Sequence, residues 1–105
     1  MAQTEITEIV KQYVQAVRMA GLPVIKAILF GSFAQNTAHA GSDIDVLIVS
    51  PAFDKVDEAS IGLLWELRAV TDARIEPVAC GQVQWETDRR SWLLQVARNE
   101  GVVVV

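Results

Sequence analysis

The chain has 105 residues with a formal net charge of −4, and hydrophobic residues make up 51% of it. This length accommodates one modest core, so we expect a single domain over residues 1–105. The acidic balance argues against direct nucleic-acid binding, which needs a basic surface. No apolar run reaches the roughly 20 residues of a membrane-spanning helix. The high apolar share predicts that a partner protein or another copy of the chain covers part of the surface.

The cellular compartment is indicated by the cysteine content and by the N-terminus. Cys80 is the only cysteine, which rules out a disulfide within the chain and favours a reducing compartment. The first residues are polar and lead into a charged helix, unlike a signal peptide. We therefore expect a cytoplasmic protein in which Cys80 is a small buried side chain.

The first elements in chain order are a helix and a strand. Apolar residues at helical spacing predict an amphipathic helix over about 4–20, with Gly21 and Pro23 as its stop. The run over 24–30 is mostly apolar and of strand length, which is typical of a buried central strand. A buried strand directly after an amphipathic helix favours an α/β arrangement.

A polar segment then joins this strand to a second one. Ser32 is a good N-cap, and it predicts a short helix over 32–37. Residues 36–42 are polar and contain glycine, so they predict a loop. Asp43 to Val49 predicts a second buried strand, because apolar residues dominate it after the first positions.

The second half of the chain completes the expected sheet. We predict a helix over about 56–71, a shorter strand over 74–80 and a last helix over 88–99. The apolar tail 102–105 is expected to form an edge strand or to be buried at an interface. These elements predict an α/β fold, a small mixed, twisted sheet flanked by helices.

The turn after the first strand has the features of a phosphate-binding turn. Gly31 lets the backbone approach a ligand without a Cβ in the way. A helix that begins near Ser32 would direct its free N–H groups and positive dipole end at that ligand. The Ser32 hydroxyl adds a further hydrogen-bond donor, but such turns are common in α/β proteins that bind no phosphate.

Two aspartates stand at the start of the second strand. Asp43 and Asp45 are two residues apart, so they project from one face with Cα atoms roughly 6.6 Å apart. A hard divalent cation can take an oxygen from each, with phosphate and water completing its octahedron. The alternative is that both are solvated residues at a strand start. The Gly-Ser turn on the preceding strand favours the metal-binding interpretation, since pairing would bring it beside them.

The segment from Phe30 to Val49, FGSFAQNTAHAGSDIDVLIV, resembles the signature of the DNA polymerase β-like nucleotidyltransferase superfamily. The small size and the N-terminal helix make the chain most similar to the minimal nucleotidyltransferases, the MNT group. That resemblance implies the polymerase β palm-like nucleotidyltransferase fold. Members of the group are often encoded beside a HEPN-type protein, for which they act as the antitoxin.

The resemblance also implies a role for each site residue. Gly31 and Ser32 would hold the β- and γ-phosphates of ATP or another nucleoside triphosphate. Asp43 and Asp45 would bind two Mg²⁺ ions. Glu76 would take the place of the third metal-binding carboxylate and assist deprotonation of the nucleophile. The implied activity is Mg²⁺-dependent transfer of AMP from ATP to a hydroxyl of a HEPN-type partner protein.

The chain departs from the family pattern at three points. The third carboxylate is usually Asp, whereas Glu76 is one methylene longer and precedes Pro77, which belongs on an edge strand or a bulge. Gln35 and Asn36 stand where many members carry Arg-Gly, so a charged phosphate contact is lost. The length leaves little room for a substrate-binding domain, so we expect acceptor specificity to come from a partner. These departures keep open a catalytically degenerate module that neutralises its partner by binding.

Overall fold

The computed structural model describes residues 3–55 and 57–105. A four-stranded sheet in the order β3-β2-β1-β4 forms its centre. The strands are β1 (Lys26–Phe30), β2 (Ile44–Ser50), β3 (Ile75–Gly81) and β4 (Val102–Val103). β1 runs antiparallel to both β2 and β4, whereas β2 and β3 are parallel. The predicted small mixed sheet is therefore confirmed.

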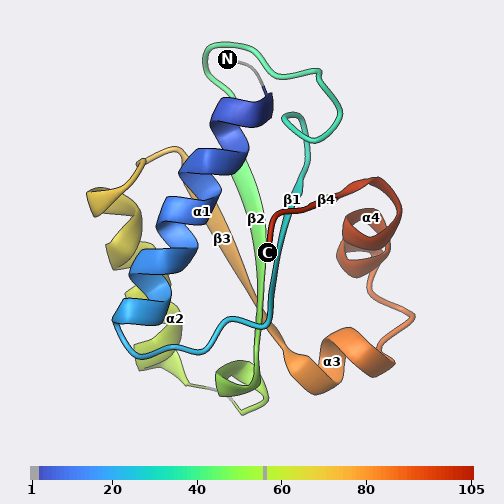
Figure 1. Ribbon diagram of the computed structural model, residues 1–105. Helices are drawn as coiled ribbons and strands as arrows, with labels where there is room; N and C mark the ends of the chain where they lie inside the picture. Colours follow the sequence, from blue (N-terminus) through green and yellow to red (C-terminus); the bar gives the residue numbers. More distant parts are fainter. Residues whose placement is uncertain (1–2, 56) are drawn as a thin grey trace.

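Helices cover both faces of this sheet (Figure 1). Helix α1 (Gln3–Met19) and helix α2 (Glu58–Leu67) lie over one face, and α2 continues as a 3-10 turn over Arg68–Val70. Helices α3 (Gln82–Thr87) and α4 (Trp92–Glu100) lie over the other.

Alternation along β2 divides the core into two layers. Ile44, Val46 and Ile48 belong to the larger cluster, which also contains the buried side of α1 and Leu64 of α2. Leu47 and Val49 point the other way and pack with the buried residues of α4. Because successive strand side chains face opposite sides, Asp45 lies on the α4 face of the sheet.

The expectations for the C-terminal valines, for Pro77 and for Cys80 are confirmed. The C-terminal valines form the edge strand β4, where Val104 donates its N–H to the Ala27 carbonyl over 2.8 Å. Pro77 lies in β3, which is the other edge of the sheet, as a residue without an N–H requires. Cys80 is buried, and burial raises the pKa of its thiol to about 11.

The short helix predicted over 32–37 is wrong. The chain forms a turn there, in which Gln35 donates to the Gly31 carbonyl over 3.2 Å and Thr37 donates to the Ser32 carbonyl over 2.9 Å. Asn36 then takes a left-handed backbone with φ 57°, which Asn tolerates better than most residues and which ends any helical path.

The last helix also differs from its predicted bounds. It begins at Trp92 with Ser91 as N-cap, and the Asp88 carboxylate instead accepts hydrogen bonds from the N–H groups of Arg90 and Ser91. The unpredicted α3 precedes it, and the Asp54 carboxylate accepts a hydrogen bond at its N-terminus, where Val83 N donates to Asp54 Oδ1 over 3.0 Å. A partner 29 residues away in sequence leaves no local signal.

The helix predicted over 56–71 is found as α2 and its 3-10 extension. Its first predicted residue, Val56, lies outside the described residues. Asp57 is the N-cap and accepts hydrogen bonds from the N–H groups of Ala59 and Ser60. The tighter turn at Arg68 leaves Val70 73% exposed, so this end of the predicted helix contributes nothing to the core.

Candidate active site

The turn after β1 lies directly against a carboxylate of β2. Gly31 has a positive φ of +75°, a backbone conformation that other residues adopt only at a cost. A Cβ built on Gly31 would overlap the side-chain oxygen Oδ2 of Asp45. Gly31 is thus required for two independent reasons, and the second ties the turn to Asp45.

The two aspartates of the motif lie in different environments. Asp43 is exposed and precedes the first residue of β2, whereas Asp45 lies within the strand and is partly buried. Ile44 between them is fully buried in the layer under α1. Asp45 pairs in register with Phe30 of β1, so the end of β1 carries the Gly31 turn past it.

Glu76 lies on the strand that flanks the aspartates on the other side. β2 and β3 are parallel, and Asp45 is in register with Glu76. Neighbouring strands are about 4.8 Å apart, so the two side chains stand next to each other on the α4 face. Glu76, for which the resemblance implies the role of third carboxylate, therefore lies beside Asp45.

The electrostatics join all three carboxylates. The pKa of Asp45 is raised above its ordinary value by burial first, then by the charge of Glu76 and the charge of Asp43. Each of these causes disfavours the ionised form. A divalent cation would remove the repulsion, and oxygen-only donors are those that Mg²⁺ prefers.

The donor set fits Mg²⁺ in kind and in charge. Over residues 3–55 and 57–105, however, no group of three or more His, Cys, Asp or Glu side chains is already arranged to hold a metal ion. Asp43, Asp45 and Glu76 would have to converge when the ion arrives, with phosphate oxygens and water completing the coordination. Repulsion among like charges is a sufficient reason for side chains to stay apart before that.

Ser32 and its neighbours form the wall of the turn. The Ser32 carbonyl accepts hydrogen bonds from the N–H and the hydroxyl of Thr37. Because no helix follows Ser32, a phosphate here would rely on backbone N–H groups of a turn and on the Ser32 hydroxyl. The helix dipole expected from the sequence does not contribute.

A hollow of about 370 Å³ lies under the loop between β1 and β2, and it is lined by Phe33, Ala38, His39, Ala40 and Arg74. The carboxylates do not line it. A hollow of about 420 Å³ lies at the turn between α1 and β1, so size does not identify the site. The chemistry of the carboxylates and the Gly31 contact do.

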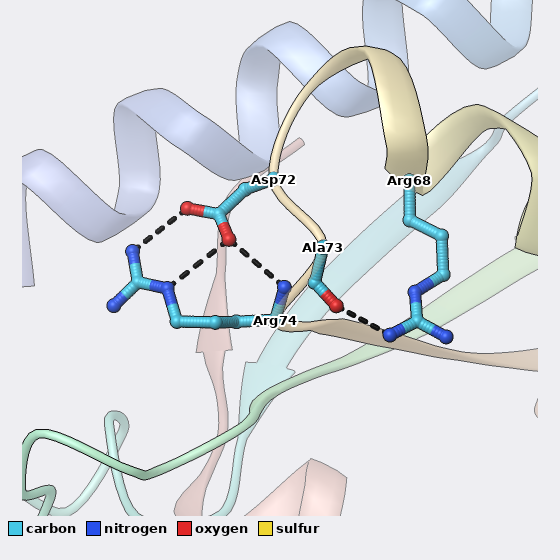
Figure 2. Close-up of polar contacts among 4 residues, drawn as sticks. All are labelled: Arg68, Asp72, Ala73 and Arg74. Carbon is cyan, nitrogen blue, oxygen red and sulfur yellow. Dashed lines mark hydrogen bonds and ion pairs between the residues drawn. The ribbon is translucent and has the colours of Figure 1, made fainter.

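Sequence reasoning missed the loop that leads into β3. Asp72 binds Arg74 twice through side chains, with Nε to Oδ1 at 3.1 Å and Nη2 to Oδ2 at 2.7 Å (Figure 2). Asp72 Oδ1 also accepts the backbone N–H of Arg74 over 2.9 Å, and Arg68 donates to the carbonyl of Ala73. An Asp and an Arg two residues apart, just before Glu76, were the available signal.

A nucleotidyltransferase domain model matches residues 5–92. The match spans more than half of the chain and includes every residue of the candidate site. The chain belongs to this family of nucleotidyltransferase domains. A search of curated proteins found no significant match.

Solved structures confirm the nucleotidyltransferase fold. A candidate nucleotidyltransferase from Sulfolobus solfataricus is 16% identical, with a TM-score of 0.66 over 96% of this chain and 80% of that one. A toxin–antitoxin complex with AMP-PNP is 23% identical, with a TM-score of 0.63 over 90% of this chain and 71% of the other. A mutant of the MntA–HpeT toxin–antitoxin is 19% identical, with a TM-score of 0.58 over 100% and 73%.

Among the described residues, no helix has both the length and the apolar character that a membrane span needs.

Proposed function

We propose that this nucleotidyltransferase-domain protein transfers AMP from ATP, with Mg²⁺, to a hydroxyl of a partner protein, and that it acts as the antitoxin of a toxin–antitoxin pair. The partner would be a HEPN-type toxin, as the resemblance of the sequence implies. The observation that carries the proposal is the meeting of three chain segments, in which Gly31 lies against Asp45 and Asp45 is in register with Glu76.

Each site residue has a role that its position supports. The turn at Gly31 and Ser32 would bind the β- and γ-phosphates, because the backbone can approach them closely only where no Cβ intervenes. Asp43 and Asp45 would hold two Mg²⁺ ions, which when bound neutralise charge on the attacking and leaving oxygens. Glu76 would orient the acceptor hydroxyl and accept its proton.

The structural relatives support the nucleotide and the partner. One of them is a toxin–antitoxin complex with AMP-PNP. In the MntA–HpeT mutant two aspartates, two positions apart, are replaced by glutamate. Asp43 and Asp45 have the same spacing.

A second candidate is a degenerate module that neutralises its partner by binding alone. It is favoured by the turn that stands in place of the predicted helix after Ser32, and by Gln35 and Asn36 at the positions where the resemblance implies Arg-Gly. Such a module would have the same fold and would bind the same partner, but it would need no metal.

Label transfer separates the two candidates. The protein is incubated with α-³²P-ATP and Mg²⁺ in the presence of the protein encoded beside it, and the label on that protein is counted. The rate of label transfer should be at least about a thousandfold lower in the Asp43→Asn, Asp45→Asn double variant. This is the scale of transition-state charge stabilisation at phosphoryl groups.

Asp54→Asn is the matched control, because Asp54 is a carboxylate at the opposite end of the sheet and should leave transfer unchanged. Transfer that survives the double variant contradicts the catalytic proposal. A stable complex with no label from any of the four nucleotides favours the degenerate module.

A further inference from the structure

We propose that Asp72 and Arg74 form a positioning pair that holds Glu76 beside Asp45 and thereby sets the affinity of the site for a divalent cation. The inference rests on the proposed function, because it assigns the pair to the same three carboxylates.

The pair fixes the backbone that enters β3. The Asp72 carboxylate accepts two hydrogen bonds from the Arg74 side chain and a third from the Arg74 backbone N–H. The carbonyl of Asp72 accepts the N–H of Ile75 over 3.1 Å. The side chains of Arg74 and Asp72 are 35% and 19% exposed, so solvent does not fully screen this bidentate contact. The segment is therefore held as one rigid turn.

This turn makes the first backbone link to the aspartate strand. The Arg74 carbonyl accepts the N–H of Ile44 over 2.8 Å. Ile44 lies between Asp43 and Asp45, and its partner in register is Ile75, next to Glu76. The hydrogen bond thus joins the two strands at the point where all three carboxylates meet.

Register matters here because side chains alternate between the faces of a strand. A slip of one residue would turn Glu76 toward the α1 face and bring a neighbouring apolar residue to the site. The repulsion among Glu76, Asp45 and Asp43 favours separation of the two strand starts. The Asp72–Arg74 pair, which ends two residues before Glu76, opposes both the slip and the separation.

A second anchor holds the same turn from α2. Arg68 donates to the Ala73 carbonyl, and its guanidinium lies 4.8 Å from the centre of the Trp65 ring. Ala73 stands between Asp72 and Arg74 (Figure 2). The turn is therefore held by contacts within itself and by one contact from Arg68 at the end of α2.

Mn²⁺ binding tests the pair without relying on turnover. The dissociation constant is measured by electron paramagnetic resonance for the full chain, for Asp72→Asn and for Glu8→Gln. The last variant removes an exposed ion pair with Lys11 and serves as the matched control. We expect Asp72→Asn to weaken Mn²⁺ binding by about tenfold, the low end of the effect of removing a direct partner of a metal ligand, because the pair acts on Glu76 through the backbone. Glu8→Gln should leave it unchanged.

Two further readouts exclude a merely structural effect. The amide of Ile44 should exchange faster in Asp72→Asn while that of Ile48 does not, since only the former bonds to the Arg74 carbonyl. In label transfer, kcat should fall and the Mg²⁺ requirement should rise, with KM for ATP little changed. If Asp72→Asn does not fold, Arg74→Gln replaces it, and Arg74→Lys should recover part of the affinity.

Equal Mn²⁺ affinity in wild type and Asp72→Asn overturns the positioning pair and leaves the proposed function intact. A wild-type protein that binds no Mn²⁺ overturns both.

Discussion

The parallel strands β2 and β3 begin and end in opposite chemistry. At their start, Asp45 and Glu76 are in register and their like charges repel. At their end Ser50 and Gly81 are in register, both buried, and the Ser50 hydroxyl accepts the N–H of Ala52 over 3.1 Å.

A carboxylate stands at each end, but with different neighbours. Asp54 meets the N-terminus of α3 and accepts the N–H of Val83, whereas Asp45 meets two further carboxylates. The contact of Asp54 with α3 thus stabilises the end of β2 and β3, whereas like charges destabilise their start.

The largest effect should come from the glycines at the two ends. Gly31→Ala should destabilise the protein by roughly 2 to 4 kcal/mol, because it combines the cost of a left-handed backbone with overlap on Asp45. Gly81→Ala should cost less, about 1 to 3 kcal/mol, since its φ of −66° is ordinary and only overlap with Asp54 and Phe53 remains. Urea unfolding measures both.

Gly21→Ala is the matched control for the backbone contribution. Gly21 has φ +101° but nothing within 4 Å of an added Cβ, so about 1 to 2 kcal/mol is expected. If Gly31→Ala costs no more than Gly21→Ala, the contact with Asp45 has no energetic weight.

Mg²⁺ should stabilise the protein through the start of β2 and β3, where the three carboxylates lie, and not through their end. At ten times its dissociation constant the ion should add about 1.4 kcal/mol to the free energy of unfolding, because it binds the folded site and not the unfolded chain. Thermal unfolding with and without Mg²⁺ measures this. The Asp43→Asn, Asp45→Asn double variant should show no such gain, and a gain of the same size there would place the ion elsewhere.

Single Asn substitutions should change stability in opposite directions at the two ends. Without a divalent cation at neutral pH, Asp45→Asn should stabilise the fold by about 0.5 to 1 kcal/mol, since it removes like-charge repulsion across the strand pair. Asp54→Asn should destabilise it by about 0.5 to 1 kcal/mol, because a charge at a helix N-terminus is lost. Losses of stability in both variants would contradict the contrast between the two ends.

The smallest expected effect is the pH dependence of the stabilisation by Asp45→Asn. The pKa of Asp45 is raised above its ordinary value of 3.8, so the folded state prefers the protonated form. Its stabilising contribution is present below pH 3.8 and is lost as pH rises through the folded-state pKa. The advantage of Asp45→Asn should therefore be full at neutral pH and shrink as pH falls toward 4.

Titration of Asp72 has the opposite effect on stability, and it limits the pH range over which the effect of Asp45 can be measured. The hydrogen bond from the Arg74 side chain is the main reason that the pKa of Asp72 lies below 3.8, so its contribution is lost only as pH falls below that value. Urea unfolding of wild type and Asp45→Asn between pH 4 and 7 isolates Asp45. A pH-independent difference would contradict the raised pKa.

Much of the fold was predictable because its signals are local. Helical spacing and apolar runs located α1, the three long strands and most of α2. The edge position of Pro77 followed from its missing N–H, and the edge strand β4 from its apolar composition. The two errors have different causes. Asp54, 29 residues away, supports the start of α3, whereas a left-handed backbone at Asn36 ends the turn after Ser32.

The sequence by itself determined the family, the mixed sheet and the residues for which a nucleotidyltransferase site could be proposed, because spacing and residue type carry that information. Only the tertiary structure decided that Gly31 lies against Asp45, that Glu76 stands in register with it, and that Asp72 and Arg74 fix the entry to its strand. Such contacts depend on which strands pair and in which register. β2 pairs with β1 residues 15 to 23 positions away and with β3 residues 31 positions away, so a local pattern does not encode the register. The Asp72–Arg74 pair is local in sequence, but its place at the entry to β3 depends on that register.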